Sequence, residues 1–319
     1  MVNHEASFIE KDKIPLIDIS GINDNIKIIE VSKLLHKASK EIGFIYVKNH
    51  GIPNDILTNL RSSAKKFFSF NEQNKKTVNV NSKHRGWISQ GGAKMQDKVS
   101  ADLKESFIWG YQDVNGKTFE DHPLRGANQW PKFCPDLEKN AMDFFQHGHK
   151  VANMLMRGFA VGLGLDEEFF VKHTGIPLSR GSIIYYPNQD SRMGDKHFGV
   201  GPHTDFGVLT LLFQDNIGGL QVQDIHGNWI HAPPIDGTIV VNVGDLLSRW
   251  TEGEYKSTPH RVINNSGKER ISMVIAYDPE PDTIIDSQNI FGKKSEFQPI
   301  TCGDYLIWRF NKAFSYRKK

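Results

Sequence analysis

The segment Gly201-Pro-His-Thr-Asp-Phe206 carries a histidine and an aspartate two residues apart, just after a proline. In an extended segment, residues two apart face the same side, so His203 and Asp205 can reach one ion while Thr204 points away. The pair alone is weak evidence, because the same residues can form a polar turn on the surface. A metal site therefore requires a third ligand from another part of the chain.

A third candidate ligand stands in Ser257-Thr-Pro-His-Arg-Val262. His260 follows a proline and precedes a strand-like run, which is where a return strand beside His203 would begin if this region forms a barrel. Two neutral imidazoles and one carboxylate suit iron(II) and leave about three of six coordination positions open. Zinc prefers a tetrahedral site and manganese prefers oxygen ligands, so both are less suited but stay open. The alternative for His260 is a structural histidine.

Arg270-Ile-Ser272 repeats the two-residue spacing a short way downstream. On a strand this spacing puts a guanidinium and a hydroxyl on one face, and together they can hold a carboxylate with charge-assisted hydrogen bonds. Arg270 could instead be an exposed strand residue, since it follows the charged pair Lys268-Glu269. Tyr186 could reach the same carboxylate from the opposite sheet, or could be a barrel aromatic.

The region around these motifs is rich in short β-branched runs separated by turn residues, which predicts strands. The segment between residues 179 and 280 is expected to be all β, with about eight strands, the number of a jelly roll. One of these strands is expected around residues 196–200. Strands are also expected near residues 14–19, 43–47, 86–88 and 106–109. Helical periodicity predicts helices near residues 26–42, 53–68, 137–164 and 304–316. The expected fold class is therefore mixed α/β (α+β).

Composition restricts the class of protein and its partners. The chain has 319 residues, a formal charge of +2, 38% hydrophobic and 24% charged residues, so a small molecule is a better partner than nucleic acid or membrane. Cys134 and Cys302 lack a metal-type spacing and indicate neither a disulfide scaffold nor a zinc site. The first residues lack a targeting pattern, and no apolar run approaches the roughly 18 residues of a membrane span. We expect a cytoplasmic enzyme, either a monomer or a small homo-oligomer.

In the order of its motifs, the chain resembles the iron(II)- and 2-oxoglutarate-dependent oxygenases of the isopenicillin N synthase-like superfamily. The resemblance covers most of the chain and includes residues 14–18, 43–53, 185–187, 199–205, 209–212, 218–222, 242–245, 258–262 and 270–272. It implies a distorted double-stranded β-helix, which is a jelly roll, buttressed by helices. It also implies a helix-rich cap with substrate-side loops (1–135), supporting helices (136–178), the jelly-roll core (179–280) and a C-terminal helix and tail (281–319).

The same resemblance implies roles for the motif residues. His203, Asp205 and His260 would ligate Fe(II) and serve as the catalytic residues. Arg270 and Ser272 would bind the distal carboxylate of 2-oxoglutarate, with help from Tyr186. The implied reaction consumes O2, converts 2-oxoglutarate to succinate and CO2, and oxidises a C–H bond of a small molecule, usually to an alcohol.

One position departs from the pattern of that superfamily. Many plant members carry asparagine two residues before the tyrosine, and Ile184 stands there in this chain. One hydrogen bond to the co-substrate is therefore expected to be missing.

Substrate specificity is expected from the loops of residues 80–110, the 188–198 connection and the C-terminal helix. Candidate substrate-binding residues are Arg85, Trp87, Phe107 and Trp109, which could instead pack between the N-terminal layer and the barrel. Two other functions stay open: an iron oxidase of the same superfamily that uses no 2-oxoglutarate, and a non-catalytic binding protein on this fold.

Overall fold

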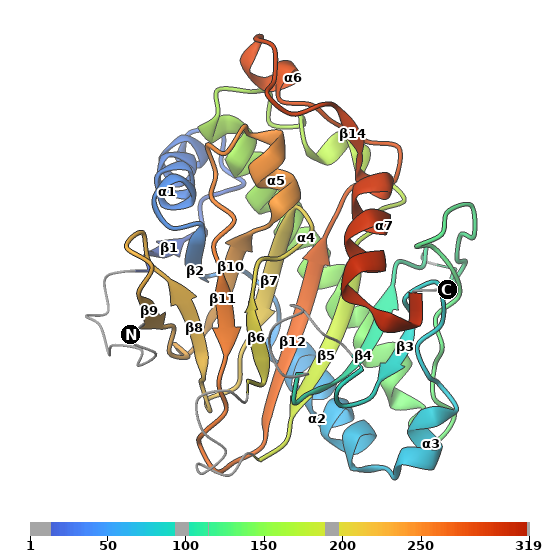
Figure 1. Ribbon diagram of the computed structural model, residues 1–319. Coiled ribbons are helices and arrows are strands. Elements are labelled where there is room, and N and C mark those ends of the chain that lie inside the picture. The colour runs from blue at the N-terminus through green and yellow to red at the C-terminus, as the bar shows by residue number, and fades with distance from the viewer. Residues whose placement is uncertain (1–13, 93–101, 114, 189–197, 318–319) are drawn as a thin grey trace.

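A large, mostly antiparallel sheet forms the centre of the fold (Figure 1). The computed structural model describes residues 14–92, 102–113, 115–188 and 198–317. In spatial order the strands of this sheet are β1 (Leu16–Asp18), β2 (Phe44–Lys48), β10 (Thr238–Val243), β7 (Leu209–Phe213), β12 (Arg270–Tyr277), β5 (Arg180–Tyr186), β4 (Glu105–Gly110) and β3 (Gly86–Ile88). Only β1 and β2 pair in parallel within this sheet.

A second, smaller sheet faces part of the first. Its strands, in spatial order, are β6 (Val200–His203), β11 (His260–Val262), β8 (Leu220–Gln223) and β9 (Trp229–His231). Apolar side chains of both sheets form one buried cluster between them, including Phe44, Tyr186, Val200, Val222 and Val262. Two antiparallel sheets packed around such an interior form a jelly roll, so the predicted fold class is confirmed.

Three long helices cover the other face of the large sheet. They are α1 (Lys27–Glu41), α2 (Asn54–Ser69) and α4 (Asp136–Gly162), and α4 packs against both of the others (Figure 1). Each is amphipathic, and on α4 Phe144 contacts Phe213 of β7 edge to face. These helices bury the outer face of the sheet, which leaves its inner face to form the site.

The first part of the chain belongs to the same sheet as the jelly roll. β1 and β2 extend the sheet beyond β10, and β3 and β4 extend it beyond β5. The expected strands near residues 14–19, 43–47, 86–88 and 106–109 are all present. The N-terminal region is therefore physically continuous with the core rather than a separate layer.

One expectation for the core is wrong. The segment from 179 to 280 is not wholly β, because α5 (Asp245–Trp250) lies between β10 and β11. Leu246, Leu247 and Trp250 are buried on one side of this short helix, and their helical spacing is hard to distinguish among the strand-like runs around it.

The remaining described elements connect or flank these layers. They are α3 (Glu72–Lys76), β13 (Ile284–Ile285), α6 (Gln288–Phe291), β14 (Ile300–Thr301), the C-terminal helix α7 (Cys302–Ala313) and short 3-10 turns at Val171–His173 and Ser315–Arg317. The expected strand beginning near Lys196 falls partly on residues outside the described ranges, and β6 begins at Val200. Within the described residues, no helix is both long and apolar enough to cross a membrane.

Candidate metal centre and co-substrate site

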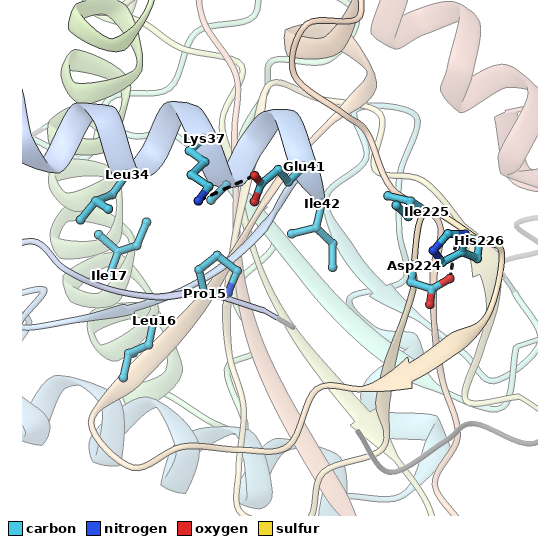
Figure 2. Close-up of a pocket in the computed structure, with 11 residues that line it drawn as sticks. Pro15, Leu16, Ile17, Leu34, Lys37, Glu41, Ile42, Asp224, Ile225 and His226 are labelled. Atoms are coloured by element: carbon cyan, nitrogen blue, oxygen red, sulfur yellow. Dashed lines mark hydrogen bonds and ion pairs between the residues drawn. The ribbon is translucent and has the colours of Figure 1, made fainter. Parts of the chain in front are cut away.

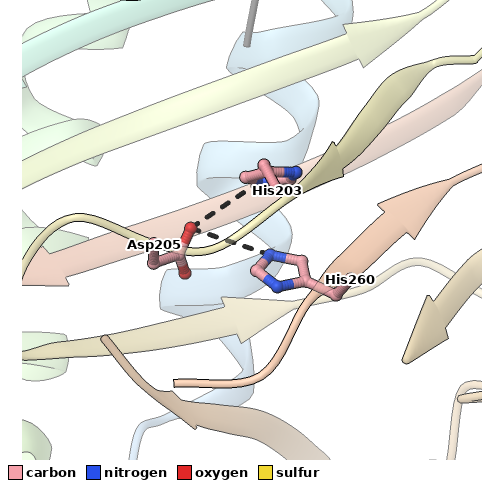
Figure 3. A group of neighbouring side chains, drawn as sticks. All are labelled: His203, Asp205 and His260. Carbon is pink, nitrogen blue, oxygen red and sulfur yellow. Dashed lines mark ion pairs between the residues drawn. The ribbon is translucent and has the colours of Figure 1, made fainter. Parts of the chain in front are cut away.

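The three candidate ligands meet at one point of the small sheet (Figure 3). His203 ends β6 and His260 begins β11, and the two residues lie directly opposite each other across the antiparallel pair. Asp205 follows β6, and its Oδ1 lies 3.7 Å from Nε2 of His203 and 3.7 Å from Nε2 of His260. All three ligand atoms lie within 4.8 Å of one another, so one ion can contact them together.

Backbone carbonyls orient both imidazoles. Nδ1 of His203 lies 2.8 Å from the carbonyl oxygen of Gly201, and Nδ1 of His260 lies 3.2 Å from that of Thr258. A carbonyl only accepts, so each Nδ1 carries the proton and each Nε2 keeps its lone pair. This tautomer is the one that binds a metal through Nε2.

The protonation states at the cluster also suit a cation. Burial, followed by the neighbouring His260, lowers the pKa of His203 to about 3, so its imidazole is neutral near pH 7. Burial alone would raise the pKa of Asp205, but the two histidines and hydrogen bonds from Asn242 and Thr210 outweigh it and lower that pKa. The cluster therefore presents two imidazole nitrogens and one carboxylate, the donor set that suits iron(II).

The second predicted group lies on β12, on the inner face of the large sheet. Arg270 is fully buried and lies opposite Tyr186, with its guanidinium carbon 4.6 Å from the centre of that ring. Ser272 is also fully buried and lies two residues further along the same strand. The structure thus places Arg270 and Ser272 on one face, as their spacing predicted, with Tyr186 beside them. The expectation that Tyr186 approaches from the opposite sheet is wrong, because it lies on β5, the strand that pairs with β12 in the same sheet.

The donors of this group lack acceptors. Among the described residues, Nε and Nη1 of Arg270 and Oγ of Ser272 have no hydrogen-bond partner, although all three atoms are buried. Buried polar groups are nearly always hydrogen-bonded, and a buried cation without an anion is costly. A carboxylate held between Arg270 and Ser272 would satisfy these donors, so the residues present fit one end of 2-oxoglutarate.

Three further residues hold this part of β12 in place. The side-chain oxygen of Gln214 accepts a 3.3 Å hydrogen bond from Nη2 of Arg270. On the residue between the two clamp positions, Ile271, the carbonyl accepts from Arg61 at 3.1 Å and the N–H donates to Asp215 at 2.6 Å. These contacts fix both the guanidinium and the backbone that carries it.

Ile184 stands where many plant members of the superfamily carry asparagine, and its apolar side chain cannot make the hydrogen bond to the co-substrate that asparagine would make. It lies opposite Ser272 on one side and opposite Ser106 of β4 on the other, and it packs against the interior apolar cluster. Its side chain offers no hydrogen bond, so any polar contact at this level of the sheet has to come from the flanking serines.

The four predicted substrate-binding residues make packing and structural contacts. The guanidinium of Arg85 donates to the carbonyls of Lys83, His84 and Leu124, and the indole of Trp87 donates to Glu105. Phe107 and Trp109 face the helices, against Phe67 and Phe144. These contacts favour the packing alternative, and a role in substrate binding stays a prediction.

Some residues at the site escaped the sequence reasoning. Asn242 donates a 2.8 Å hydrogen bond to Oδ2 of Asp205, and Gln214 holds Arg270. Lys104 is buried and immediately precedes β4, on the side away from Phe107. Strict alternation along Lys104-Glu105-Ser106-Phe107 is the signal that could have placed this lysine on the inner face.

A cavity of about 480 Å³ elsewhere on the molecule is separate from these groups (Figure 2). It lies between α1, β1 and the turn joining β8 to β9, and its lining includes Leu16, Leu34 and Ile225. None of the candidate site residues lines it. It contributes nothing to the metal centre.

Comparison with protein families gives two matches that together cover most of the chain. Residues 179–279 match the 2OG-Fe(II) oxygenase superfamily. Residues 14–133 match the N-terminal region of the non-haem dioxygenases, described as non-haem dioxygenase in morphine synthesis N-terminal. The first match contains the metal cluster and the β12 pair.

Individual relatives and solved structures agree with these matches. A homoarginine-6-hydroxylase of Glycine max is 35% identical, covering 92% of this chain and 95% of the relative. A 2-oxoglutarate-Fe(II) type oxidoreductase of Emericella nidulans is 29% identical, covering 96% and 93%. The crystal structure of a full-length Neurospora crassa protein in complex with alpha-KG and thymine superposes with a TM-score of 0.84 at 29% identity, covering 95% of this chain and 98% of that one.

Proposed function

Because the chain belongs to the 2OG-Fe(II) oxygenase superfamily, we propose that His203, Asp205 and His260 hold its iron and that Arg270, Ser272 and Tyr186 hold its 2-oxoglutarate. The protein is a 2-oxoglutarate-dependent dioxygenase, an oxidoreductase that acts on a small molecule. When bound, iron and 2-oxoglutarate supply the oxidising chemistry, in which O2 is consumed and 2-oxoglutarate becomes succinate and CO2.

The single observation that carries the co-substrate assignment is the set of buried donors on β12. Nε and Nη1 of Arg270 and Oγ of Ser272 converge without acceptors in the described part of the chain. Tyr186 stacks on the guanidinium and limits its movement, so the cation is oriented before a ligand arrives.

The metal residues contribute position and protonation state. The carbonyls of Gly201 and Thr258 keep Nε2 of each histidine available, and Asn242 holds one oxygen of Asp205 so that the other faces the imidazoles. An apolar cluster fills the interior of the barrel next to them and limits the access of water to the metal residues. We expect the usual outcome to be hydroxylation of a C–H bond, with residues 179–280 carrying this chemistry and the other segments supporting it.

The substrate is expected to be a small organic molecule of the size that related enzymes take. The Neurospora crassa protein has been crystallised with thymine, and the relative from Glycine max is named a homoarginine hydroxylase. Both compounds are suitable first candidates for this chain. The two differ in charge, so they also report on the electrostatics of the substrate site.

The test is 2-oxoglutarate turnover by the purified protein with Fe(II) and O2. We expect release of CO2 from the first carbon of 2-oxoglutarate and an equal yield of succinate, both lost in His203→Ala and Asp205→Ala variants that remain folded. Turnover that survives in Asp205→Ala, or a wild type that releases no CO2 with any candidate substrate, would contradict the assignment.

A further inference from the structure

A buried lysine lies near the strand that carries His203, and the metal centre and the co-substrate site do not use it. Lys104 is 8% exposed and immediately precedes β4. Its ammonium lies 3.5 Å from Oδ2 of Asp102, a residue that is 2% exposed. Within the described ranges this is the only charged contact of Lys104, and no hydrogen bond accompanies it. A lysine ammonium has three donors, and Nζ of Lys104 is not among the fully buried polar atoms that lack a partner, so it stays within reach of a ligand.

The direction of the Lys104 side chain follows from its neighbours. The next residue, Glu105, points to the helix side, where it accepts from Lys75 at 2.7 Å and from the indole of Trp87 at 2.7 Å. Successive side chains on a strand alternate, so Lys104 lies on the opposite side, with Ser106. Ser106 lies opposite Ile184, which belongs to the interior apolar cluster. The ammonium is therefore on the side of the jelly-roll interior.

Asp102 contacts both Lys104 and β6, the strand that ends with the candidate metal ligand His203. Its Oδ1 accepts a 3.2 Å hydrogen bond from the N–H of Gly201, two residues before His203. The adjacent backbone also contacts this strand's entry, since the N–H of Leu103 donates to the carbonyl of Phe198.

Lys104 differs from the other cations of this region in being available. Arg85 is committed to three backbone carbonyls, and Lys75 is in close contact with Glu105. Arg270 faces the co-substrate site described above. Asp102 neutralises Lys104 over a distance longer than a hydrogen bond, and its Oδ2 has no hydrogen-bond partner among the described residues. The contact with Asp102 therefore positions the ammonium of Lys104 and leaves its N–H donors available to another acceptor.

We propose that Lys104 is a substrate-binding residue that takes a carboxylate of the small molecule oxidised at this site. This inference rests on the proposed function, because it assumes that iron and 2-oxoglutarate fill the adjacent groups. It deepens that function by naming an acidic substrate class. A carboxylate is favoured over a neutral carbonyl because it can take the charge-assisted hydrogen bonds that the ammonium offers.

Binding of matched acids and amides to the anaerobic complex of protein, Fe(II) and 2-oxoglutarate tests the proposal. The pairs are acetate with acetamide, phenylacetate with phenylacetamide, and cinnamate with cinnamamide, followed by the change in the iron-to-2-oxoglutarate charge-transfer band. We expect at least one acid to bind the wild type about tenfold more tightly than its amide, the size typical of a hydrogen bond to a charged group. If no acid of the panel binds better than its amide, the proposal is wrong.

Variants separate substrate binding from a structural role of the lysine. Lys104→Met should remove the preference for the acid and leave the affinity for 2-oxoglutarate within about twofold, whereas Lys104→Arg should keep part of the preference. Lys75→Met is the matched control, since it removes another buried lysine on the helix side of β4. Asp102→Asn keeps the cation and removes its counter-charge, so it should keep or increase the preference for the acid; loss of the preference in this variant would contradict the proposal even if Lys104→Met fails to fold.

Two results of these titrations distinguish a failure of the proposed function from a failure of the inference about Lys104. A wild type that forms no charge-transfer band with Fe(II) and 2-oxoglutarate contradicts the proposed function itself. A normal band combined with weaker 2-oxoglutarate binding in Lys104→Met contradicts only the present inference, because Lys104 would then belong to the co-substrate site.

Discussion

Asn242 donates a 2.8 Å hydrogen bond to Oδ2 of Asp205, and this bond leaves Oδ1 facing the two histidines. The two residues are far apart in sequence, and they meet because β10 and the segment after β6 lie side by side near Thr210 of β7. Partners of this kind fix the orientation of a metal-binding carboxylate.

Replacing this partner should weaken the metal site without removing a ligand. We expect Asn242→Leu to lower the affinity for Fe(II) or Mn(II) by about 10- to 100-fold, the range found when such outer partners are lost. Asn140→Leu is the control, because it breaks a 2.8 Å side-chain bond to Ser63 between α4 and α2. Equal metal affinities in the two variants would show that Asn242 does not position Asp205.

Gln214 should affect the co-substrate rather than the metal. Its side chain accepts from Arg270, so Gln214→Leu leaves another guanidinium donor without an acceptor and lets the cation move. We expect the dissociation constant for 2-oxoglutarate to rise by about tenfold, with metal affinity unchanged. Gln221→Leu, which removes the 2.7 Å contact to Arg261 in the small sheet, should leave 2-oxoglutarate binding as in the wild type. Identical shifts in both variants would count against the role of Gln214.

The pair of Arg180 and Asp278 should matter for stability. Asp278 is fully buried, lies 3.0 Å from the guanidinium of Arg180, and accepts from the N–H of Val208 in the segment that follows Asp205. Removing one member of a buried pair leaves the other charge uncompensated, so Asp278→Ala should lower the free energy of unfolding by about 3–5 kcal/mol.

Denaturant unfolding measures this loss, with an exposed pair as reference. Glu72→Ala breaks the contact to Lys76 within α3 and should cost less than about 1 kcal/mol. If both substitutions cost the same, the buried pair is not a stabilising element of the segment that follows Asp205.

His84 should make stability depend on pH. It is buried, and burial followed by the charges of Arg180, Arg85 and Arg317 lowers its pKa well below the usual value. The folded protein keeps His84 neutral while the unfolded chain takes up a proton below about pH 6.5, so this group destabilises the fold as the pH falls, by about 1.4 kcal/mol per pH unit. His84→Gln should have a shallower pH dependence of unfolding on the acid side. Parallel profiles for the variant and the wild type would contradict this prediction.

Much of the fold could be predicted from local sequence. The bounds predicted from strand-like runs and helical periodicity agree within a few residues with those of β5, β7, β10, β12, α1 and α4. Each of these elements buries one face, so its sequence carries a regular apolar pattern. α5 was missed because six residues give too short a period to stand out from neighbouring strands. The joining of β1–β4 to the jelly roll depends on long-range pairing, which local patterns do not encode.

The site residues likewise divide into those with a local sequence signal and those placed only by long-range contacts. His203, Asp205, Arg270 and Ser272 could be predicted because two-residue spacing on a strand puts each pair on one face. Asn242 and Gln214 contact residues that are distant in sequence, and only the pairing of the strands brings them to their partners. Arg85, a candidate substrate-binding cation, donates to three backbone carbonyls, and its role in substrate binding stays a prediction.

The central claim is that iron held by His203, Asp205 and His260 binds 2-oxoglutarate whose other end reaches Arg270 and Ser272. Anaerobic titration of the protein with Fe(II) and 2-oxoglutarate tests it most directly. The account predicts a charge-transfer band that saturates at one 2-oxoglutarate per protein, disappears in His260→Ala, and requires at least about tenfold more 2-oxoglutarate in Arg270→Met. A wild type without the band, or an Arg270→Met variant with unchanged 2-oxoglutarate affinity, would contradict it.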